Sequence, residues 1–263
     1  MGRLILVIVA FFLSVEGIKA QGINDWDTLN LMTFNIYHGE TMKGDFDLNY
    51  IARIIKEKQP DFVALQEVDF KTRRALDKDI ATELGLRTSL APLFGLAMPF
   101  NDGGYGVGVL SKWAIERSEL IKLPGANNTE PRVALEIKVV LPSGKSLLFV
   151  STHLDHSDRV VRWSQMQFLK NRYGNMAIPV IIAGDLNELP TGENMKELLD
   201  NFRMSDGTKK EPSYPSNQPS SKIDYILLSK AHSWKVVSTE VMNDSVASDH
   251  RALHCKVILD AKE

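Results

Sequence analysis

Six apolar, strand-like runs along this chain each begin or end at a polar residue that can bind a metal ion or exchange a proton. The junctions are Thr33–Ile36, Gln66–Glu67, Thr152–Asp155, Gly184–Asn187, Ile223–Ile226 and Ser248–His250. In α/β sheets, ligands bind at such junctions between strand ends and loops. Each junction alone is more typical of a turn, a cap or a surface ion pair. Six of them in one chain predict a single site gathered at the strand ends.

The hydrophobic periodicity predicts an α/β (α+β) fold. Strands are expected over Thr28–Tyr37, Asp61–Glu67, Tyr105–Leu110, Trp113–Leu123, Ile178–Ala183, Ile223–Leu228, Ser233–Met242 and Ala252–Leu259, with a hairpin of Arg132–Leu141 and Ser146–Thr152. Helices are expected after an N-cap at Asp47, over Ala75–Leu84 closed by Gly85, over Asp158–Tyr173, and from a cap at Thr191 through Leu199. This pattern predicts two sheets packed face to face with helices outside.

Residues 1–20 have the pattern of a secretory signal peptide. Arg3 gives a basic start, Leu4–Val15 is an apolar run, and Ala20 offers a small residue at the cut. The run is shorter than the roughly 20 residues that span a bilayer. The alternative is an uncleaved anchor, but Glu16 ends the run early. We therefore expect an exported chain, periplasmic or secreted, with residues 21–263 forming one domain and no membrane span.

The charges of the expected mature chain are nearly balanced. Without residues 1–20, it holds 29 basic and 32 acidic side chains, a net charge of −3 with histidine neutral. Strong binding to nucleic acid independent of sequence usually needs a basic face, and this balance indicates none. The one cysteine, Cys255, excludes an intrachain disulfide and lies in an alternating run, where a small buried residue is expected.

The residue types at the junctions suit the hydrolysis of a phosphate ester. That reaction needs a cation near the phosphoryl oxygens and an activated water. Glu67 and Asp249, assisted by Asn35, offer the few oxygen ligands that Mg²⁺ prefers. Asp185 and Asn187 would point to one side of an extended chain and could hold a water and a phosphate oxygen.

Two histidines complete this set. His250 can donate to the phosphate if a carboxylate holds its other ring nitrogen, and Asp224 is the candidate partner. His153 is expected to be a second donor or an acid. These side chains predict a catalytic group as well as a metal site.

Taken in order, the six junctions resemble the endonuclease/exonuclease/phosphatase superfamily, which is deoxyribonuclease I-like. The resemblance covers nearly all of the mature chain and implies a four-layer α/β/β/α sandwich with Mg²⁺- or Mn²⁺-dependent cleavage of phosphoesters. It implies Glu67, Asn35 and Asp249 as metal ligands, Asp185 as the residue that orients or deprotonates water, Asn187 and His153 as phosphate contacts, and Asp224 with His250 as an Asp–His pair.

The chain looks most similar to the compact bacterial metal-dependent hydrolases of this superfamily. It shares with them a basic segment after Glu67, a Gly-Tyr-Gly at Tyr105, and Arg251 after the Asp–His pair. Arg73 or its neighbour could grip an anionic head group, although a solvated charge run is equally consistent. Tyr105 could line the pocket or could be a plain strand residue.

We therefore expect an exported phosphoesterase that acts on a phosphodiester or a phosphomonoester and works as a monomer. A small molecule or lipid head group is favoured as the substrate, and a nuclease acting on DNA or RNA is the alternative. The competing hypothesis of another class is a non-catalytic domain that binds a ligand on the same fold. No position of the expected catalytic set is missing, which favours the enzyme.

Overall fold

A computed structural model describes residues 26–207 and 211–260, so the predicted leader, residues 1–20, lies outside the described residues. The described chain forms two six-stranded sheets. In order across the first sheet, the strands are β11 (Trp234–Val241), β12 (Leu253–Asp260), β1 (Trp26–Asn35), β2 (Phe62–Phe70), β4 (Gly103–Ser111) and β3 (Ala91–Phe100). In order across the second, they are β5 (Ile115–Lys122), β6 (Val133–Val140), β7 (Ser146–His153), β8 (Val180–Asp185), β10 (Asp224–Ser229) and β9 (Phe202–Met204).

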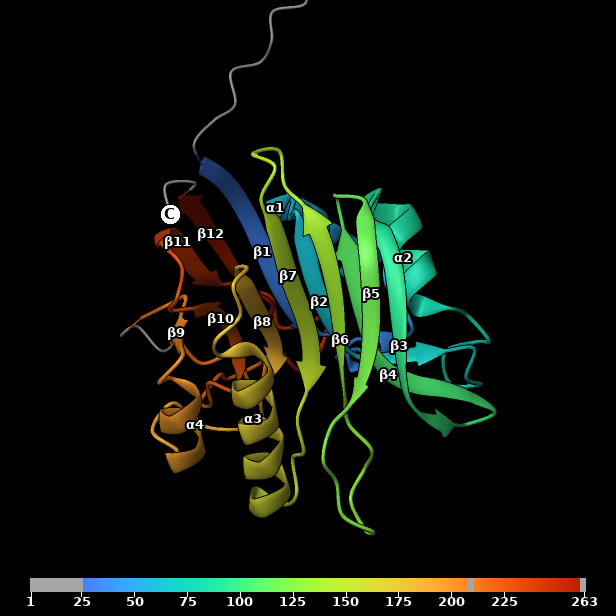
Figure 1. The fold of residues 1–263 in the computed structure, drawn as a ribbon. Helices are drawn as coiled ribbons and strands as arrows, with labels where there is room; N and C mark the ends of the chain where they lie inside the picture. Colours follow the sequence, from blue (N-terminus) through green and yellow to red (C-terminus); the bar gives the residue numbers. More distant parts are fainter. Residues whose placement is uncertain (1–25, 208–210, 261–263) are drawn as a thin grey trace, which may run out of the picture.

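Helices cover the outer faces of both sheets (Figure 1). The helices are α1 (Leu48–Lys58), α2 (Ile80–Thr88), α3 (Arg159–Tyr173) and α4 (Glu193–Leu198), with a 3-10 turn, η1, at Tyr37–Gly39. Apolar residues of α1 and α2 share a core with the first sheet, and those of α3 and α4 share one with the second. The predicted four-layer α/β/β/α sandwich is confirmed.

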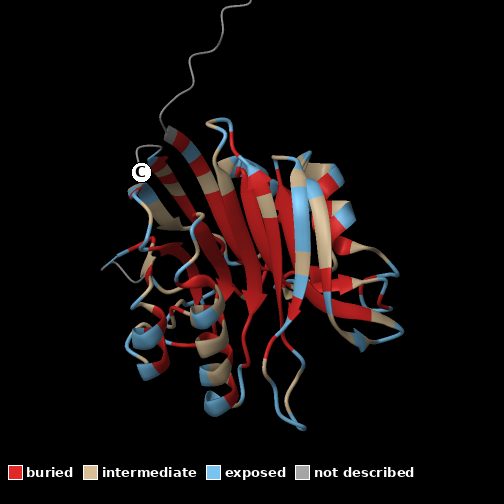
Figure 2. Cartoon of the chain, in the orientation of Figure 1, coloured by how far each residue is buried: buried red, intermediate tan, exposed pale blue. Residues whose placement is uncertain are grey.

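The alternation of side chains along β1 decides which core each residue enters. Leu29 and Leu31 lie in the core between the two sheets, whereas Met32 and Phe34 lie under the helices of the first sheet. Successive side chains of a strand point to opposite faces, which explains this division. Figure 2 shows the resulting buried interior of both sheets. β1 therefore contributes apolar side chains to two separate cores.

Aspartate caps begin three of the helices. The carboxylate of Asp47 accepts from two backbone N–H groups at the start of α1, and Asp158 does the same for α3. The helix predicted over residues 75–84 exists with other bounds, because it begins after a cap at Asp79 and continues through Gly85 to Thr88. The cap predicted at Thr191 was wrong, since Gly192 is the N-cap of α4 and makes no side-chain hydrogen bond.

Strand pairing brings distant polar residues to one level. In the parallel pair of β7 and β8, His153 lies opposite Asp185. In the antiparallel pair of β8 and β10, Asp185 lies opposite Asp224. In the other sheet, Asn35 at the end of β1 lies opposite Gln66 of β2. Both sheets therefore deliver their polar residues to the same end of the sandwich.

Candidate active site

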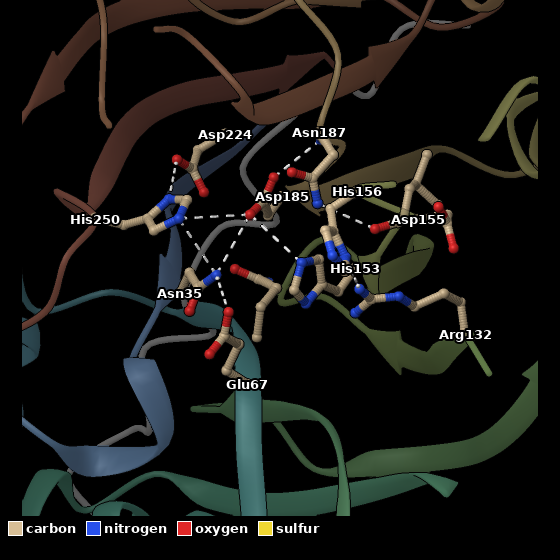
Figure 3. A network of polar contacts seen from close by, with 12 residues as sticks. Asn35, Glu67, Arg132, His153, Asp155, His156, Asp185, Asn187, Asp224 and His250 are labelled. Carbon is tan, nitrogen blue, oxygen red and sulfur yellow. Dashed lines mark hydrogen bonds and ion pairs between the residues drawn. The ribbon is translucent and has the colours of Figure 1, made fainter. Parts of the chain in front are cut away.

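The predicted polar residues meet where β1, β7 and β8 end, where β10 begins, and at an irregularity inside β2 (Figure 3). The loop before β12 brings Ser248, Asp249 and His250 to the same place, because the Ser248 hydroxyl donates to the Asn35 carbonyl oxygen at 2.7 Å. Asn35 and His250 are 215 positions apart in the chain, yet their side chains lie within 3.5 Å. The fold thus assembles one site from both sheets.

Asp224 and His250 form a buried pair. Asp224 Oδ2 lies 2.8 Å from His250 Nδ1, and the Ser213 hydroxyl donates to the same oxygen at 2.5 Å. Burial alone would lower the pKa of His250, but the charge of Asp224 and its hydrogen bond raise that pKa to about 10. The imidazole therefore carries a positive charge near neutral pH.

Asp185 is the centre of the group. Its Oδ2 lies 3.3 Å from Asn35 Nδ2, 3.5 Å from His153 Nε2 and 3.6 Å from His250 Nε2. Burial, followed by the charge of Asp224, raises the pKa of this carboxyl to about 7. A carboxylate with this pKa can accept a proton near neutral pH.

Asn187 does not continue β8 in extended form, so the predicted geometry of Asp185 and Asn187 was wrong. Asn187 has a left-handed backbone with φ 52°, and its N–H donates to Asp185 Oδ1 at 2.9 Å. This is a turn closed by an aspartate side chain, a conformation that asparagine tolerates well. The side-chain amide of Asn187 donates to the Leu154 carbonyl oxygen at 3.1 Å. Its predicted contact with phosphate stays a prediction.

Glu67 and Asn35 lie side by side, Asn35 at the end of β1 and Glu67 inside β2, at an irregularity between Leu65 and Val68 where its φ is 56°. The strand predicted to end at Glu67 therefore continues to Phe70. Asn35 Nδ2 donates to Glu67 Oε1 at 3.1 Å, and His38 Nδ1 lies 3.9 Å from the other carboxylate oxygen. Burial raises the pKa of Glu67, but these two neighbours help to lower it overall, to about 2. Glu67 is therefore ionised at any physiological pH.

Asp249 lies close enough to Glu67 for the two charges to interact. The Ser248 hydroxyl lies 3.2 Å from Asp249 Oδ1. Burial raises the pKa of Asp249; the charge of His250 opposes this rise, while the charge of Glu67 adds to it. The charge of Glu67 thus raises the proton affinity of Asp249, and a bound cation would relieve this repulsion.

The donor set fits a hard divalent cation. Glu67 and Asp249 offer carboxylate oxygens, and Glu67 is already ionised. Asn35 would have to turn its amide to act as a ligand, because its Nδ2 faces Glu67 and its Oδ1 accepts from the Tyr37 N–H at 3.2 Å. Asp185, Asp224 and His250 also bring ligand atoms within 4.8 Å of one another. His250 is a poor ligand here because its raised pKa keeps it protonated and a metal needs a neutral imidazole. The set around Glu67 is the better match.

His153 is a buried, neutral imidazole. Burial lowers its pKa well below the usual value, and the nearby charge of Arg132 lowers it further. Its Nδ1 is buried and has no hydrogen-bond partner among the described residues. His153 can therefore act as a hydrogen-bond donor or acceptor toward a ligand, whereas His250 acts as a cation.

The two predicted substrate-binding residues differ in position. Arg73 is exposed and pairs with Asp102 at 2.5 Å, so its predicted role stays a prediction. Its neighbour Arg74 donates two hydrogen bonds to the fully buried Asp69, at 2.7 and 2.9 Å, and lies 5.7 Å from the ring centre of Tyr105. Burial and the charge of Glu67 raise the pKa of Tyr105, which places this tyrosine beside the site.

Four residues near the site were not predicted. They are His38, Arg132, His156 and Ser213. His38 follows Asn35 by three positions and His156 follows His153 by three, so proximity to a recognised junction was a usable signal. Arg132 and Ser213 had no such signal, because only the tertiary fold brings them to the site.

Comparison with known solved structures shows the same fold at low sequence identity. An endonuclease/exonuclease/phosphatase from Beutenbergia cavernae is 21% identical with a TM-score of 0.76, over 89% of this chain and 72% of that one. A mannosyl-6-phosphatase from Bacteroides thetaiotaomicron is 17% identical with a TM-score of 0.70, over 87% and 99%. The human Nocturnin catalytic domain with a bound sulfate anion is 22% identical with a TM-score of 0.68, over 90% and 98%.

Comparison with curated protein sequences gave no match. The sequence model of the Endonuclease/Exonuclease/phosphatase family matches residues 32–250. This match spans every junction that forms the site, from Asn35 to His250. Members of that family are hydrolases of phosphoester bonds and generally depend on a divalent metal. The chain belongs to the endonuclease/exonuclease/phosphatase family.

Proposed function

We propose that this protein is an exported, divalent-metal-dependent phosphoesterase that hydrolyses a phosphodiester or phosphomonoester. One observation carries the proposal: Asp185 Oδ2 lies within 3.6 Å of nitrogen atoms of Asn35, His153 and His250, while Asp224 holds His250 from behind. Asp185, which can accept a proton, thus lies beside His250, which is a cationic hydrogen-bond donor.

The residues divide the work by charge state. Asp185, with its pKa near 7, orients a water molecule and takes its proton as the oxygen attacks phosphorus. The bond from phosphorus to the alcohol oxygen breaks, and the departing oxygen takes a proton from solvent. His250, kept cationic by Asp224, donates a hydrogen bond to a phosphoryl oxygen. Glu67, Asn35 and Asp249 would hold Mg²⁺ or Mn²⁺, which supplies positive charge to the phosphoryl oxygens when bound.

A small phosphorylated molecule or a lipid head group is the favoured substrate. The net charge of the full chain is −2, which gives no general attraction for a polyanion. The mannosyl-6-phosphatase from Bacteroides thetaiotaomicron has a similar fold, so this sandwich can accommodate a phosphomonoester. Hydrolysis of DNA or RNA is the alternative within the same chemistry.

A non-catalytic binding domain is the alternative of another class. It would not need Asp185 to have a pKa near 7 beside a cationic His250, an arrangement suited to proton transfer. Replacing Asp185 with Asn keeps the size of the side chain and removes its proton acceptor. Loss of turnover with retained ligand binding in Asp185→Asn supports the enzyme, and ligand binding without turnover in both proteins supports the binding domain.

Export is proposed from the pattern of residues 1–20, and the mature protein is proposed to be a monomer. In the described ranges, residues 26–207 and 211–260, no helix has the length and hydrophobicity needed to cross a membrane. Mass spectrometry of the protein recovered outside the cytoplasm, with an N-terminus near Gln21, would support export.

A substrate panel tests the proposal. Purified residues 21–263 would be assayed with Mg²⁺ or Mn²⁺ against p-nitrophenyl phosphate, bis-p-nitrophenyl phosphate, sugar phosphates, sphingomyelin and plasmid DNA. We expect metal-dependent release of phosphate or alcohol from at least one small ester, and little cleavage of DNA. No turnover on any of them, together with no binding of metal, contradicts the proposal.

A further inference from the structure

Arg132, at the start of β6, is a buried cation that the proposed chemistry does not use. Its side chain is 3% exposed. Its only carboxylate partner among the described residues is Glu130, at 3.1 Å, and its Nε is buried with no hydrogen-bond partner. A buried charge is costly unless it is paired and hydrogen-bonded. Arg132 therefore retains capacity to bind an anion.

This guanidinium lies directly beside the proposed active site (Figure 3). It is close enough to His153 to lower the pKa of that histidine, after the larger effect of burial. It also interacts with Tyr105, whose pKa is raised by burial and by Glu67. Arg132 thus stands on the wall shared by His153 and Tyr105, next to the ligand set around Glu67.

His156 extends this wall to the surface. Arg132 Nη2 lies 3.2 Å from His156 Nδ1, and the imidazole is exposed. Arginine can only donate, so Nδ1 accepts and the proton of the neutral ring sits on Nε2. The buried guanidinium therefore orients an exposed N–H donor at the mouth of the site.

Arg74 provides a second fixed guanidinium on the other side of Tyr105. Asp69 holds it through two hydrogen bonds, and its guanidinium carbon lies 4.5 Å from the centre of the Phe100 ring. The charges of Asp224, Asp185 and Asp249 all act on His250. An anionic group beyond the reacting phosphate would be repelled by these carboxylates and attracted by the arginines.

We infer that Arg132 and His156, with Arg74 across Tyr105, form a second anion subsite that binds a non-reacting phosphate of a small substrate carrying two phosphate groups. The inference rests on the proposed phosphoesterase activity and names its substrate class. A small molecule is favoured over nucleic acid because the subsite contains only one buried arginine, Arg132. His156 lies on one side of it, and Arg74 lies across Tyr105. A nucleic-acid chain would need a basic groove that follows its backbone.

Steady-state kinetics with Mg²⁺ test the subsite. The substrates are p-nitrophenyl phosphate, glucose 6-phosphate, glucose 1,6-bisphosphate and a short single-stranded oligonucleotide. The variants are Arg132→Gln, Arg132→Lys and His156→Ala, with Arg159→Gln as a control that removes an exposed arginine three positions from His156. Circular dichroism and thermal unfolding check the fold of each variant.

We expect the parent to favour the bisphosphate over the monophosphate at least tenfold in kcat/KM. Arg132→Gln should lose this preference through a higher KM for the bisphosphate, a change several times larger than any change in its kinetics on p-nitrophenyl phosphate. Arg159→Gln should keep the preference of the parent. Arg132→Lys should restore part of the preference. His156→Ala should lose part of it, and, because this side chain is exposed, it remains informative if Arg132→Gln fails to fold.

Three results overturn the inference. One is a parent that shows no preference for the bisphosphate, and another is an equal loss on all substrates in Arg132→Gln. A loss confined to the oligonucleotide would assign the subsite to nucleic acid. If the parent turns over nothing, the phosphoesterase proposal fails separately. Calorimetric titration of the metal-free protein with inorganic phosphate then tests the subsite alone. If Arg132→Gln and His156→Ala bind phosphate as tightly as the parent, the inference of a subsite is wrong.

Discussion

At the scale of single residues, the charge of His250 depends on Asp224. Asp224→Asn removes the charge that lies 2.8 Å from His250 Nδ1. The pKa of His250 should fall clearly below about 10, because burial is then opposed only by the charges of Asp185 and Asp249. Titration of the imidazole by NMR in the metal-free protein measures this shift. We also expect kcat to fall by about 10³–10⁴-fold, as for the loss of an orienting aspartate in a dyad.

Asp200→Asn is the matched control for this change. Asp200 is exposed and pairs with Lys170 on the surface at 2.9 Å. The pKa of His250 and kcat should both stay at the values of the parent. A pKa for His250 that is the same in Asp224→Asn and in the parent would contradict the proposed role of the pair.

The same shift predicts how stability depends on pH. The pKa of His250 in the folded protein, about 10, lies above its usual value of 6.5. Its protonation therefore stabilises the folded state fully below pH 6.5, and this contribution is lost as the pH rises through about 10. The melting temperature of the metal-free protein should fall between pH 7 and 10, by less in Asp224→Asn. An equal fall in both proteins would rule out His250 as the cause.

The members of the site could be predicted from residue type, but their geometry could not. The residue types at the strand ends identified Asp185, Asp224 and His250, which the structure brings together. At Asn187 a turn was the alternative to an extended chain, and the structure shows the turn, with a left-handed φ and a hydrogen bond to Asp185 Oδ1. Arg132 was missed because its burial beside His153 depends on pairing between β6 and β7.

At the scale of elements, the helix caps give a direct test. Asp158→Ala removes the carboxylate that accepts from two N–H groups of α3, and it should lower the free energy of unfolding by about 1 kcal/mol. Thr191→Ala should change it by less than about 0.5 kcal/mol, because Thr191 is exposed and Gly192 is the N-cap of α4. Urea denaturation measures both. A larger loss in Thr191→Ala than in Asp158→Ala would contradict these assignments.

The close approach of β7 and β8 requires Gly184. A Cβ at this position would lie 2.0 Å from the Thr152 carbonyl oxygen, so the strands would have to move apart. Gly184→Ala should lower the free energy of unfolding by about 3 kcal/mol or more and reduce activity, since the opposition of His153 and Asp185 would be disturbed.

Gly125→Ala is the control for the glycine change. A Cβ there meets only the Thr129 hydroxyl, at 3.6 Å, which is ordinary contact. Urea denaturation should place this variant within about 0.5 kcal/mol of the parent. If Gly184→Ala were equally mild, the proposed constraint on strand pairing would be wrong.

Most strands could be predicted because their apolar residues alternate or run continuously. β3 was missed, since its side chains are mostly half-exposed and it contains Pro92, Gly95 and Pro99, which are typical of loops. The start of α2 was misplaced because the capping carboxylate is Asp79, whereas the buried Ala75 belongs to the turn before it. Local sequence does not distinguish a buried turn from a first helical turn.

At the scale of the whole molecule, the site lies between the two sheets, and both contribute side chains to it. β1 and β2 bring Asn35 and Glu67 from one sheet, and β7, β8 and β10 bring His153, Asp185 and Asp224 from the other. The four-layer arrangement could be predicted from the order of elements and from the family resemblance. The relative placement of the sheets could not, because it depends on the shared core between them, such as the stacked Phe62 and Phe149 rings.

The proposed phosphoester hydrolysis depends on a divalent cation that Glu67 holds. The most direct measurement is the rate of hydrolysis of bis-p-nitrophenyl phosphate and p-nitrophenyl phosphate by the parent and by Glu67→Gln, before and after EDTA and readdition of Mg²⁺ or Mn²⁺. We predict that EDTA abolishes the activity of the parent, that the metal restores it, and that Glu67→Gln lowers it by at least about 100-fold. If turnover is unchanged by EDTA and also unchanged in Glu67→Gln, hydrolysis does not depend on a cation held by Glu67.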